Sequence, residues 1–279
     1  MLDDLSFEVS PGIKVGVVGR TGAGKSTMSL ALSRIVELCG GRIEIDGINI
    51  SEIDINQVRE KITVIAQDPT LFTGTLRFNV DPFREHSNAA IEQLLLRAGL
   101  SDLLNREPEQ AAGLAQSKDS DNKKERKYST EASEMLPSAD LNTSKRERQE
   151  KKKKNKGIYF KITEGGANLS AGERQLICIC RAILRKNKVV VLDEATANID
   201  IVTEQKIQQL IEQEFQESTV ITIAHRLNTI IKSDKVLVLS HGKKLEYDSP
   251  AALMEDPDSH FSGLLKELKQ KEKEEQAEK

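Results

Sequence analysis

The sequence contains no tryptophan, few aromatic residues (4%) and three cysteines. The cysteines, Cys39, Cys178 and Cys180, have no spacing typical of a disulfide framework or a zinc site, which indicates a reducing compartment. No run of roughly 18 apolar residues could span a bilayer, and the N-terminus lacks the basic and apolar regions of a signal peptide. The formal net charge of −3 gives no global attraction to nucleic acid or anionic lipid. The sequence has 279 residues, of which 38% are hydrophobic. This length and composition predict one large domain or one domain with an insertion.

The hydrophobic periodicity switches repeatedly between two and 3.6 residues, which is typical of an α/β protein. Ile43 and Ile45 precede Asp46-Gly47, a pattern that predicts a β-hairpin. Apolar runs predict strands at 13–18, 62–66, 189–192, 220–224 and 236–239. Helical spacing predicts helices at 28–38, 87–100 and 170–187, a helix with Ile207, Leu210 and Ile211 facing inward, and a helix that begins at Ser249-Pro250.

The segment 107–155 differs in character, because lysine-rich clusters alternate with Ser, Asp, Asn and Glu and almost no β-branched or aromatic residue occurs. Such a segment cannot bury enough apolar area to offset the entropy of ordering. We therefore predict a single domain formed by 1–106 and 156–262, a disordered charged insertion at 107–155, and a charged, exposed helical tail at 263–279. The insertion is either a solvated linker or a basic arm for lipid headgroups or RNA.

A glycine-rich loop follows the first predicted strand and precedes the first predicted helix. It fits the pattern G-x-x-x-x-G-K-[ST] in the structural context that this pattern requires. Its glycines let backbone N–H groups surround a polyphosphate, while Lys25 would bridge the β- and γ-phosphates and the Ser26 hydroxyl would ligate Mg²⁺. A mere glycine-rich turn is the alternative. The residues predicted to bind nucleotide here are Gly19, Arg20, Thr21, Gly22, Ala23, Gly24, Lys25, Ser26 and Thr27.

An acidic pair, Asp193-Glu194, ends the apolar run 189–192. At the carboxyl end of a parallel strand, Asp193 can hold Mg²⁺ through water and Glu194 can polarise an attacking water molecule. Acidic pairs at strand ends are common, so this interpretation depends on the glycine-rich loop in the same chain. Together the two motifs predict nucleotide hydrolysis.

The predicted helix 170–187 opens with Leu169-Ser170-Ala171-Gly172-Glu173. Ser170 and Glu173 have the S-x-x-E spacing of a capping box, which satisfies backbone N–H groups at a helix start. The same residues resemble the LSGGQ signature of the ATP-binding cassette (ABC) family and occupy its place ahead of Asp193. This resemblance implies that Ser170 and Gly172 contact the γ-phosphate of ATP held by an opposing cassette in a head-to-tail dimer.

Further matches follow in the order typical of the ABC family. Gln67 resembles the Q-loop glutamine, which ligates Mg²⁺ and senses the transmembrane partner, Asp200 resembles the D-loop aspartate, and His225 resembles the switch histidine that contacts the γ-phosphate. Alone, His225 would be read as a hydrogen-bonded histidine at a strand end. The resemblance implies a P-loop NTPase with an ABC-type core sheet, an antiparallel β subdomain and an inserted α-helical signature subdomain. It implies the catalytic residues Glu194, His225, Lys25 and Gln67, the metal ligands Ser26, Gln67 and Asp193, and the cofactors ATP and Mg²⁺.

The segments 163–166 (TEGG) and 67–76 (QDPTLFTGTL) are similar to the second cassette of the C-type, or multidrug-resistance-associated, exporters. In that group the second cassette keeps the glutamate that Glu194 matches, which implies a transport-coupled ATPase. The implied partners are a second cassette and the transmembrane domain of an exporter, at the cytoplasmic face of a membrane. No nucleic-acid partner is expected.

Three features depart from the family pattern. The sequence contains no adenine-stacking aromatic residue ahead of the first strand, Glu173 replaces the signature glutamine, and the insertion interrupts the helical subdomain. A carboxylate near a γ-phosphate is unfavourable unless capping turns it back toward Ser170. Two alternatives therefore remain: a nucleotide-gated dimerisation module with little hydrolysis, and a soluble ABC ATPase that acts on ribosomes or DNA. We expect the membrane-spanning half to lie outside this sequence.

Overall fold

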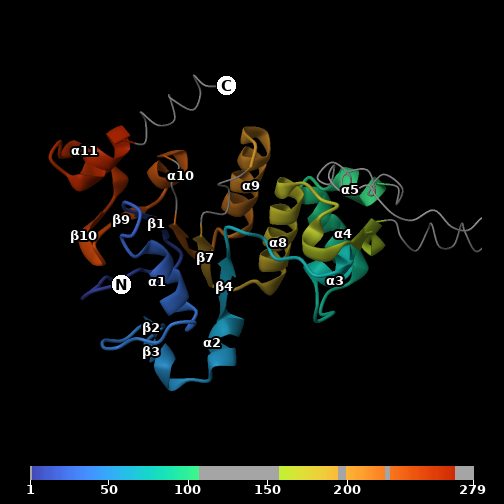
Figure 1. Cartoon of the computed structure of the whole chain (residues 1–279), viewed down its shortest axis with the longest axis horizontal. Coiled ribbons are helices and arrows are strands. Elements are labelled where there is room, and N and C mark those ends of the chain that lie inside the picture. Colours follow the sequence, from blue (N-terminus) through green and yellow to red (C-terminus); the bar gives the residue numbers. More distant parts are fainter. Residues whose placement is uncertain (1, 107–156, 194–198, 224–226, 268–279) are drawn as a thin grey trace, which may run out of the picture. The chain divides into compact units, whose positions relative to one another are not determined.

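The computed structural model of the chain describes residues 2–106, 157–193, 199–223 and 227–267 (Figure 1). These residues belong to two compact units, Met1–Pro69 with Arg185–Lys279, and Thr70–Leu184. The predicted insertion, most of the predicted tail, and the candidate catalytic residues Glu194 and His225 lie outside the described residues.

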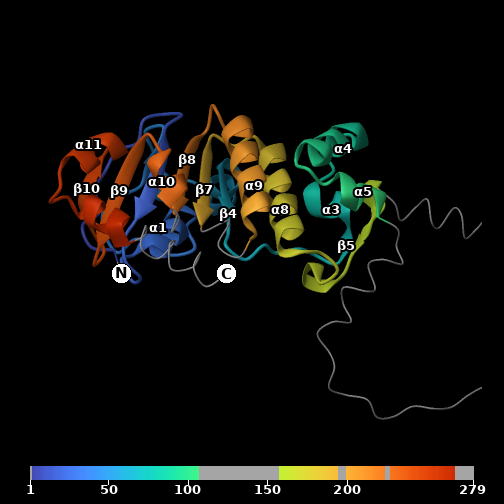
Figure 2. The same ribbon diagram turned by 90° about the horizontal axis from the view of Figure 1, so that it is seen from above.

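The first unit is built on a six-stranded sheet with the order β10-β9-β1-β8-β7-β4 (Figure 2). The pairs β9–β1, β1–β8, β8–β7 and β7–β4 are parallel, and the edge pair β9–β10 is antiparallel. The apolar runs correctly predicted every parallel strand, whereas the mostly exposed β10 was missed. The strands are β1 (Lys14–Val18), β4 (Ile62–Ile65), β7 (Val189–Asp193), β8 (Thr219–Ile223), β9 (Lys235–Ser240) and β10 (Lys243–Asp248).

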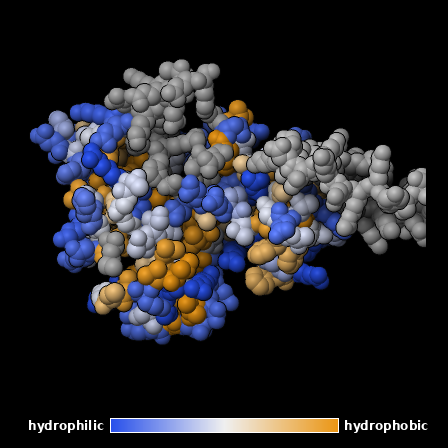
Figure 3. Space-filling model, viewed as in Figure 1, coloured by the Kyte–Doolittle hydropathy of each residue, from blue (hydrophilic) through white to orange (hydrophobic). Residues whose placement is uncertain are grey.

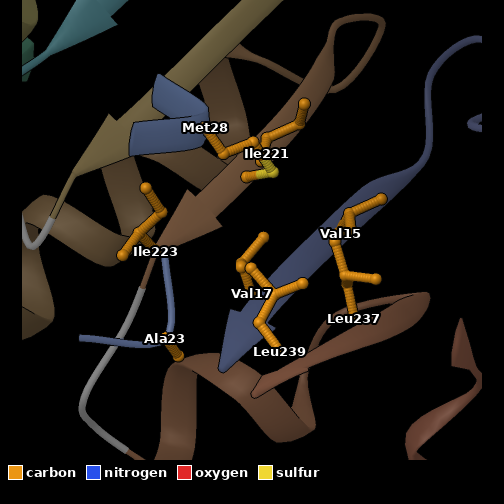
Figure 4. Close-up of a cluster of buried hydrophobic side chains, with 8 residues drawn as sticks. All are labelled: Val15, Val17, Ala23, Met28, Ile221, Ile223, Leu237 and Leu239. Carbon is orange, nitrogen blue, oxygen red and sulfur yellow. The ribbon is translucent and has the colours of Figure 1, made fainter. Parts of the chain in front are cut away.

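Both faces of this sheet are covered. On β9, Leu237 and Leu239 join one apolar cluster, whereas Val236 and Val238 join another, because successive side chains of a strand point to opposite faces. Burying each such side chain contributes about 1.5 to 3 kcal/mol. The packing fixes the end of β1, from which the glycine-rich loop leaves. The first cluster, shown in Figure 4, contains Val15, Val17, Ala23, Met28, Ile221, Ile223, Leu237 and Leu239.

Short helices and one hairpin complete the first unit. The predicted turn at Asp46-Gly47 is confirmed, with φ angles of 52° and 76° as a type I′ turn requires. In the described residues, no helix combines the length and the apolar character that crossing a membrane requires. The elements are α1 (Lys25–Leu32), β2 (Glu44–Ile45), β3 (Ile48–Asn49), the 3₁₀ helix η1 (Ile50–Glu52), α2 (Ile55–Lys61), α9 (Ile201–Glu214), α10 (Leu227–Ile231) and α11 (Pro250–Glu255), followed by a helical stretch at 260–267.

Helix α1 is shorter than the predicted helix 28–38. It ends at Leu32, because Arg34 adopts a φ of +48° and donates hydrogen bonds of 2.9 and 2.8 Å to the carbonyl oxygens of Ile50 and Ile53. The next apolar residues, Ile35 and Val36, are exposed rather than buried on a helix face. Figure 3 shows apolar residues on this face of the first unit, near the end of α1.

The start of the predicted tail is also different from expectation. Phe261 and Leu265 are buried against Val236 and Val238, so the helical stretch 260–267 forms part of the core. Lys266 and Glu267, which follow Leu265, are exposed, and the many lysines and glutamates in the sequence from here on obscured the apolar face of this stretch.

The second unit consists of helices and a short antiparallel strand pair. The predicted helices at 87–100 and 170–187 are confirmed as α4 and α8, and Ser87 caps α4. In the strand pair, Gly74 lies opposite Ile162 and Thr75 opposite Lys161, so a segment before 107 pairs with one after 156. The elements are β5 (Gly74–Thr75), α3 (Leu76–Val80), α4 (Asn88–Arg97), α5 (Ser101–Asn105), η2 (Gly157–Tyr159), β6 (Lys161–Ile162), η3 (Glu164–Gly166) and α8 (Ala171–Arg185).

Candidate functional site

The candidate residues of the first unit gather at the carboxyl edge of its sheet. Val17 of β1 and Asp193 of β7 are both in register with Ile223 of β8, and Ile65 of β4 is in register with Leu192. The glycine-rich loop therefore begins beside the end of β8, with Asp193 one strand further. Gln67 follows the end of β4 and is exposed at the same edge. In parallel α/β sheets, ligands bind outside this edge.

The loop approaches β9 so closely that its first residue must be glycine. A Cβ atom at Gly19 would lie 2.3 Å from the carbonyl oxygen of Leu239 and 3.0 Å from the Cβ of Ala23. The backbone N–H of Gly242, in the β9–β10 turn, donates to the carbonyl of Ala23 at 3.1 Å. The loop is thus held by the sheet on one side and by this turn on the other.

Lys25 places its ammonium group inside the loop. Its Nζ donates hydrogen bonds of 2.8 Å to the carbonyl of Gly19 and 3.3 Å to that of Arg20, and the residue is only 6% exposed. The neighbouring Ser26 is exposed and Thr27 is half-buried, both in the first turn of α1. A buried cation beside an exposed hydroxyl is an arrangement that suits a phosphate group with a metal ion.

The N-terminus of α1 supports the same conclusion. Helix α1 has no side-chain cap at Gly24, whose φ is +103°, and its first turn contains no acidic residue. The N–H groups of a helix start attract anions through their free donors and through the helix dipole. The loop therefore fits a polyphosphate.

The outer part of the loop is more exposed. Thr21 and Gly22 are exposed, and Arg20 pairs with Glu267 at 2.6 Å, where both side chains are largely in solvent. Such an exposed pair contributes little to folding stability. It does, however, connect the loop to the helical stretch 260–267.

The residues expected to hold Mg²⁺ come from neighbouring elements. Asp193 is the half-buried last residue of β7, and α1, which carries Ser26, packs against this strand. Among the described residues, no three His, Cys, Asp or Glu side chains cluster in a way that could hold a metal ion. Proteins usually bind Mg²⁺ through one or two carboxylates together with substrate phosphates, so a single aspartate with a serine hydroxyl fits this ion.

Asp200 caps α9. Its Oδ1 accepts a hydrogen bond of 2.9 Å from the backbone N–H of Thr203. Hydrogen bonds from the N–H and then the side chain of Thr203 lower the pKa of Asp200 below its usual value. The predicted contact of Asp200 with nucleotide stays a prediction.

In the second unit, the predicted capping box is present at the start of α8. The N–H of Ser170 donates to Oε2 of Glu173 at 2.8 Å, and the N–H of Glu173 donates to Oγ of Ser170 at 3.1 Å. Oε1 of Glu173 accepts a hydrogen bond from Nη2 of Arg106. Gly172 is buried in the first turn. The carboxylate of Glu173 is thus turned back toward Ser170, which is the arrangement that an acidic residue at this position requires.

Sequence reasoning missed two polar residues that support this helix start. Asn168, only 2% exposed, accepts hydrogen bonds from the N–H and hydroxyl of Thr163 and donates to the carbonyl of Lys161. Arg106 lies far from Glu173 in the sequence, and no local pattern marks that pair. For Asn168, the one feature in the sequence that could have indicated this role is its amide side chain among small and apolar residues.

Comparisons with known proteins identify similar chains. A family described as ABC transporter matches residues 2–197. Multidrug resistance protein mrp-7 of Caenorhabditis elegans is 42% identical over 99% of this chain, and ATP-binding cassette sub-family C member 3 of Homo sapiens is 42% identical over 91%. The chain spans 15% and 14% of the length of these two relatives. A solved structure of a bacterial Atm1-family ABC exporter with ATP bound aligns with a TM-score of 0.72 and 29% identity, covering 94% of this chain and 38% of that chain.

Proposed function

This chain belongs to the ABC transporter family, and we propose that it binds and hydrolyses ATP as a nucleotide-binding domain that powers export through a transmembrane partner. The observation that carries the proposal is the ammonium of Lys25, held inside a glycine loop at the uncapped start of α1. The match to a bacterial ABC exporter with ATP bound, together with relatives named for multidrug resistance and efflux, supports export as the process.

In this proposal the first unit holds the triphosphate. Backbone N–H groups of the loop 19–27 and the Lys25 ammonium bind the β- and γ-phosphates, and Ser26, Gln67 and Asp193 hold Mg²⁺. The metal, when bound, neutralises charge that develops on the phosphate oxygens. The contribution of the protein is therefore mainly positioning and electrostatic stabilisation.

Glu194 and His225 complete the proposed catalytic set, although both lie outside the described residues. Their support is their place in the sequence: Glu194 follows Asp193, the last residue of β7, and His225 comes two residues after Ile223, the last residue of β8. Glu194 orients the attacking water, and His225 binds the γ-phosphate.

The proposed partners are a second cassette and a transmembrane domain. Ser170 and Gly172 face the γ-phosphate held by the second cassette, so that ATP closes a head-to-tail dimer. Exposed apolar residues beyond α1, among them Ile35 and Val36, support docking of a protein partner on the first unit. We place this assembly at the cytoplasmic face of a membrane.

The test is the substitution Glu194→Gln, measured as MgATP hydrolysis and as ATP binding by the purified chain with and without a second cassette. We expect turnover to be lost while ATP binding is retained. The control is Glu212→Gln, because Glu212 is exposed on α9 and pairs with Lys232. Unchanged turnover in Glu194→Gln would refute the proposed role.

A nucleotide-gated dimerisation module with little hydrolysis is the alternative that Glu173 favoured. Single-turnover hydrolysis separates it from an ATPase, because only an ATPase releases phosphate from its closed dimer. The engagement of both Glu173 oxygens within the protein weakens the argument for this alternative. A role on ribosomes or DNA rested on the basic segment 107–155 alone, and no described residue adds support to it.

A further inference from the structure

We propose that Arg106 is a positioning residue of the ATP-dependent dimer: it neutralises Glu173 and holds its carboxylate against Ser170, so that the start of α8 can receive a phosphate. This inference rests on the proposed function, in which Ser170 and Gly172 face the γ-phosphate of an opposing cassette.

The first argument is the geometry of the Glu173 carboxylate. One oxygen accepts the backbone N–H of Ser170 at 2.8 Å, and the other accepts a hydrogen bond from the Arg106 guanidinium. The side chains of Arg106 and Glu173 are 18% and 17% exposed. Because the two donors hold different oxygens, the carboxylate cannot turn toward the outer surface of the helix start without breaking one of these bonds.

The second argument is electrostatic. The positive end of a helix dipole attracts an anion, but an acidic residue in the first turn already uses this attraction. An incoming γ-phosphate would therefore meet the charge of Glu173, and water screens this repulsion poorly at a half-buried site. The Arg106 guanidinium cancels that charge at contact distance. The Nη1 group of the neighbouring Arg174 does not bind Glu173, because it donates a hydrogen bond to the carbonyl of Leu169.

The third argument is the small contribution of the Arg106–Glu173 ion pair to folding stability. Nη1 of Arg106 is buried and has no hydrogen-bond partner among the described residues. A half-buried ion pair is a poor source of folding stability, since desolvation offsets much of its attraction. A pair of this kind is better explained by a role in arranging charge.

The position of Arg106 in the chain matters as well. It follows α5 directly, and its backbone N–H donates a hydrogen bond to the carbonyl of Leu103. Glu173 lies 67 residues further along. The pair thus joins the two parts of the second unit that precede and follow the segment 107–156, next to the predicted signature.

A double-mutant cycle tests the proposal. Arg106→Gln and Glu173→Gln are made singly and together in the full chain. ATP-dependent association with a second cassette is measured in a Glu194→Gln background, where hydrolysis is expected to stop. Steady-state ATP hydrolysis is measured in the native background. With Glu173 present, we expect Arg106→Gln to raise the ATP concentration needed for association and turnover by roughly tenfold. With Glu173→Gln, the same substitution is expected to have less than about a twofold effect, because no carboxylate needs neutralising.

Two controls separate charge from folding. Arg106→Lys keeps the charge and is expected to recover most of the association. Arg42→Gln removes an exposed pair with Glu44 and is expected to change nothing. Equal losses from Arg106→Gln in both Glu173 backgrounds, or losses that follow a lowered melting temperature, would overturn the inference while leaving the proposed function intact. If the native chain neither associates with a second cassette in the presence of ATP nor hydrolyses ATP, the proposed function is overturned, and the inference with it.

Discussion

Nζ of Lys25 donates a hydrogen bond of 2.8 Å to the carbonyl oxygen of Gly19, across the loop that these two residues delimit. The ammonium group of Lys25 therefore lies where a triphosphate is expected to bind, and backbone carbonyl groups of the loop hold it there. The first prediction concerns this cation.

Lys25→Ala is expected to weaken ATP binding by about 100-fold, because the charge-assisted hydrogen bonds of an ammonium to phosphate contribute roughly 1.5 to 3 kcal/mol each. The measurement is calorimetric titration with ATP. Lys206→Ala, an exposed lysine on α9, serves as the control. An unchanged dissociation constant for Lys25→Ala would argue against a phosphate site in this loop.

Gly19→Ala is expected to disturb both folding and nucleotide binding, because its Cβ would meet the carbonyl oxygen of Leu239 at 2.3 Å. The backbone cannot yield without moving β9 or the loop, so we expect a loss of about 1 to 3 kcal/mol in the free energy of unfolding. Denaturant titration measures this loss. In Gly40→Ala no atom lies within 4 Å of the new Cβ, and stability should be retained; equal stability of the two variants would contradict the close approach.

Asn79→Ala is expected to destabilise the second unit. The buried Asn79 side chain accepts from the N–H of Phe72 and donates to the carbonyls of Phe72 and Thr75. Removing it takes away three hydrogen bonds to part-buried backbone groups, at a cost of about 1 to 3 kcal/mol. Thermal unfolding, compared with the exposed Asn56→Ala, reports the cost. A melting temperature like that of Asn56→Ala would mean that these bonds are not formed in solution.

The cap of α9 gives a prediction about pH. Hydrogen bonds from Thr203 lower the pKa of Asp200 in the folded chain, so folding is stabilised above the ordinary aspartate pKa, and this contribution is lost as the pH falls through the lowered value. Asp200→Asn can still cap the helix but does not titrate. We expect its unfolding free energy to fall less steeply than that of the native chain below about pH 4. Parallel pH profiles would show that Asp200 does not carry this effect.

The sequence predicted the parallel strands well and the ends of other elements poorly. Runs such as 189–192 are apolar throughout because both faces of the sheet are buried, as is typical of parallel strands. The predicted helix 28–38 extends past the end of α1 at Leu32 because Ile35 and Val36 continue its periodicity, whereas Arg34 ends the helix through hydrogen bonds to a distant segment. The strand β10 was missed because an edge strand needs only backbone pairing, which leaves no apolar pattern.

For the site, local patterns in the sequence were sufficient to predict a chemistry. The glycine-rich loop, Asp193 and the Ser170-Glu173 capping box are local patterns, in which neighbouring residues supply both the geometry and the functional groups. The way in which the exceptional Glu173 is accommodated could not be predicted, because Arg106 contacts it from another part of the chain. Only the tertiary structure showed why Gly19 must be glycine, since Leu239 approaches it across the sheet. Hydrophobic periodicity indicates which faces are buried, but it does not indicate which residues far apart in the sequence meet across those faces.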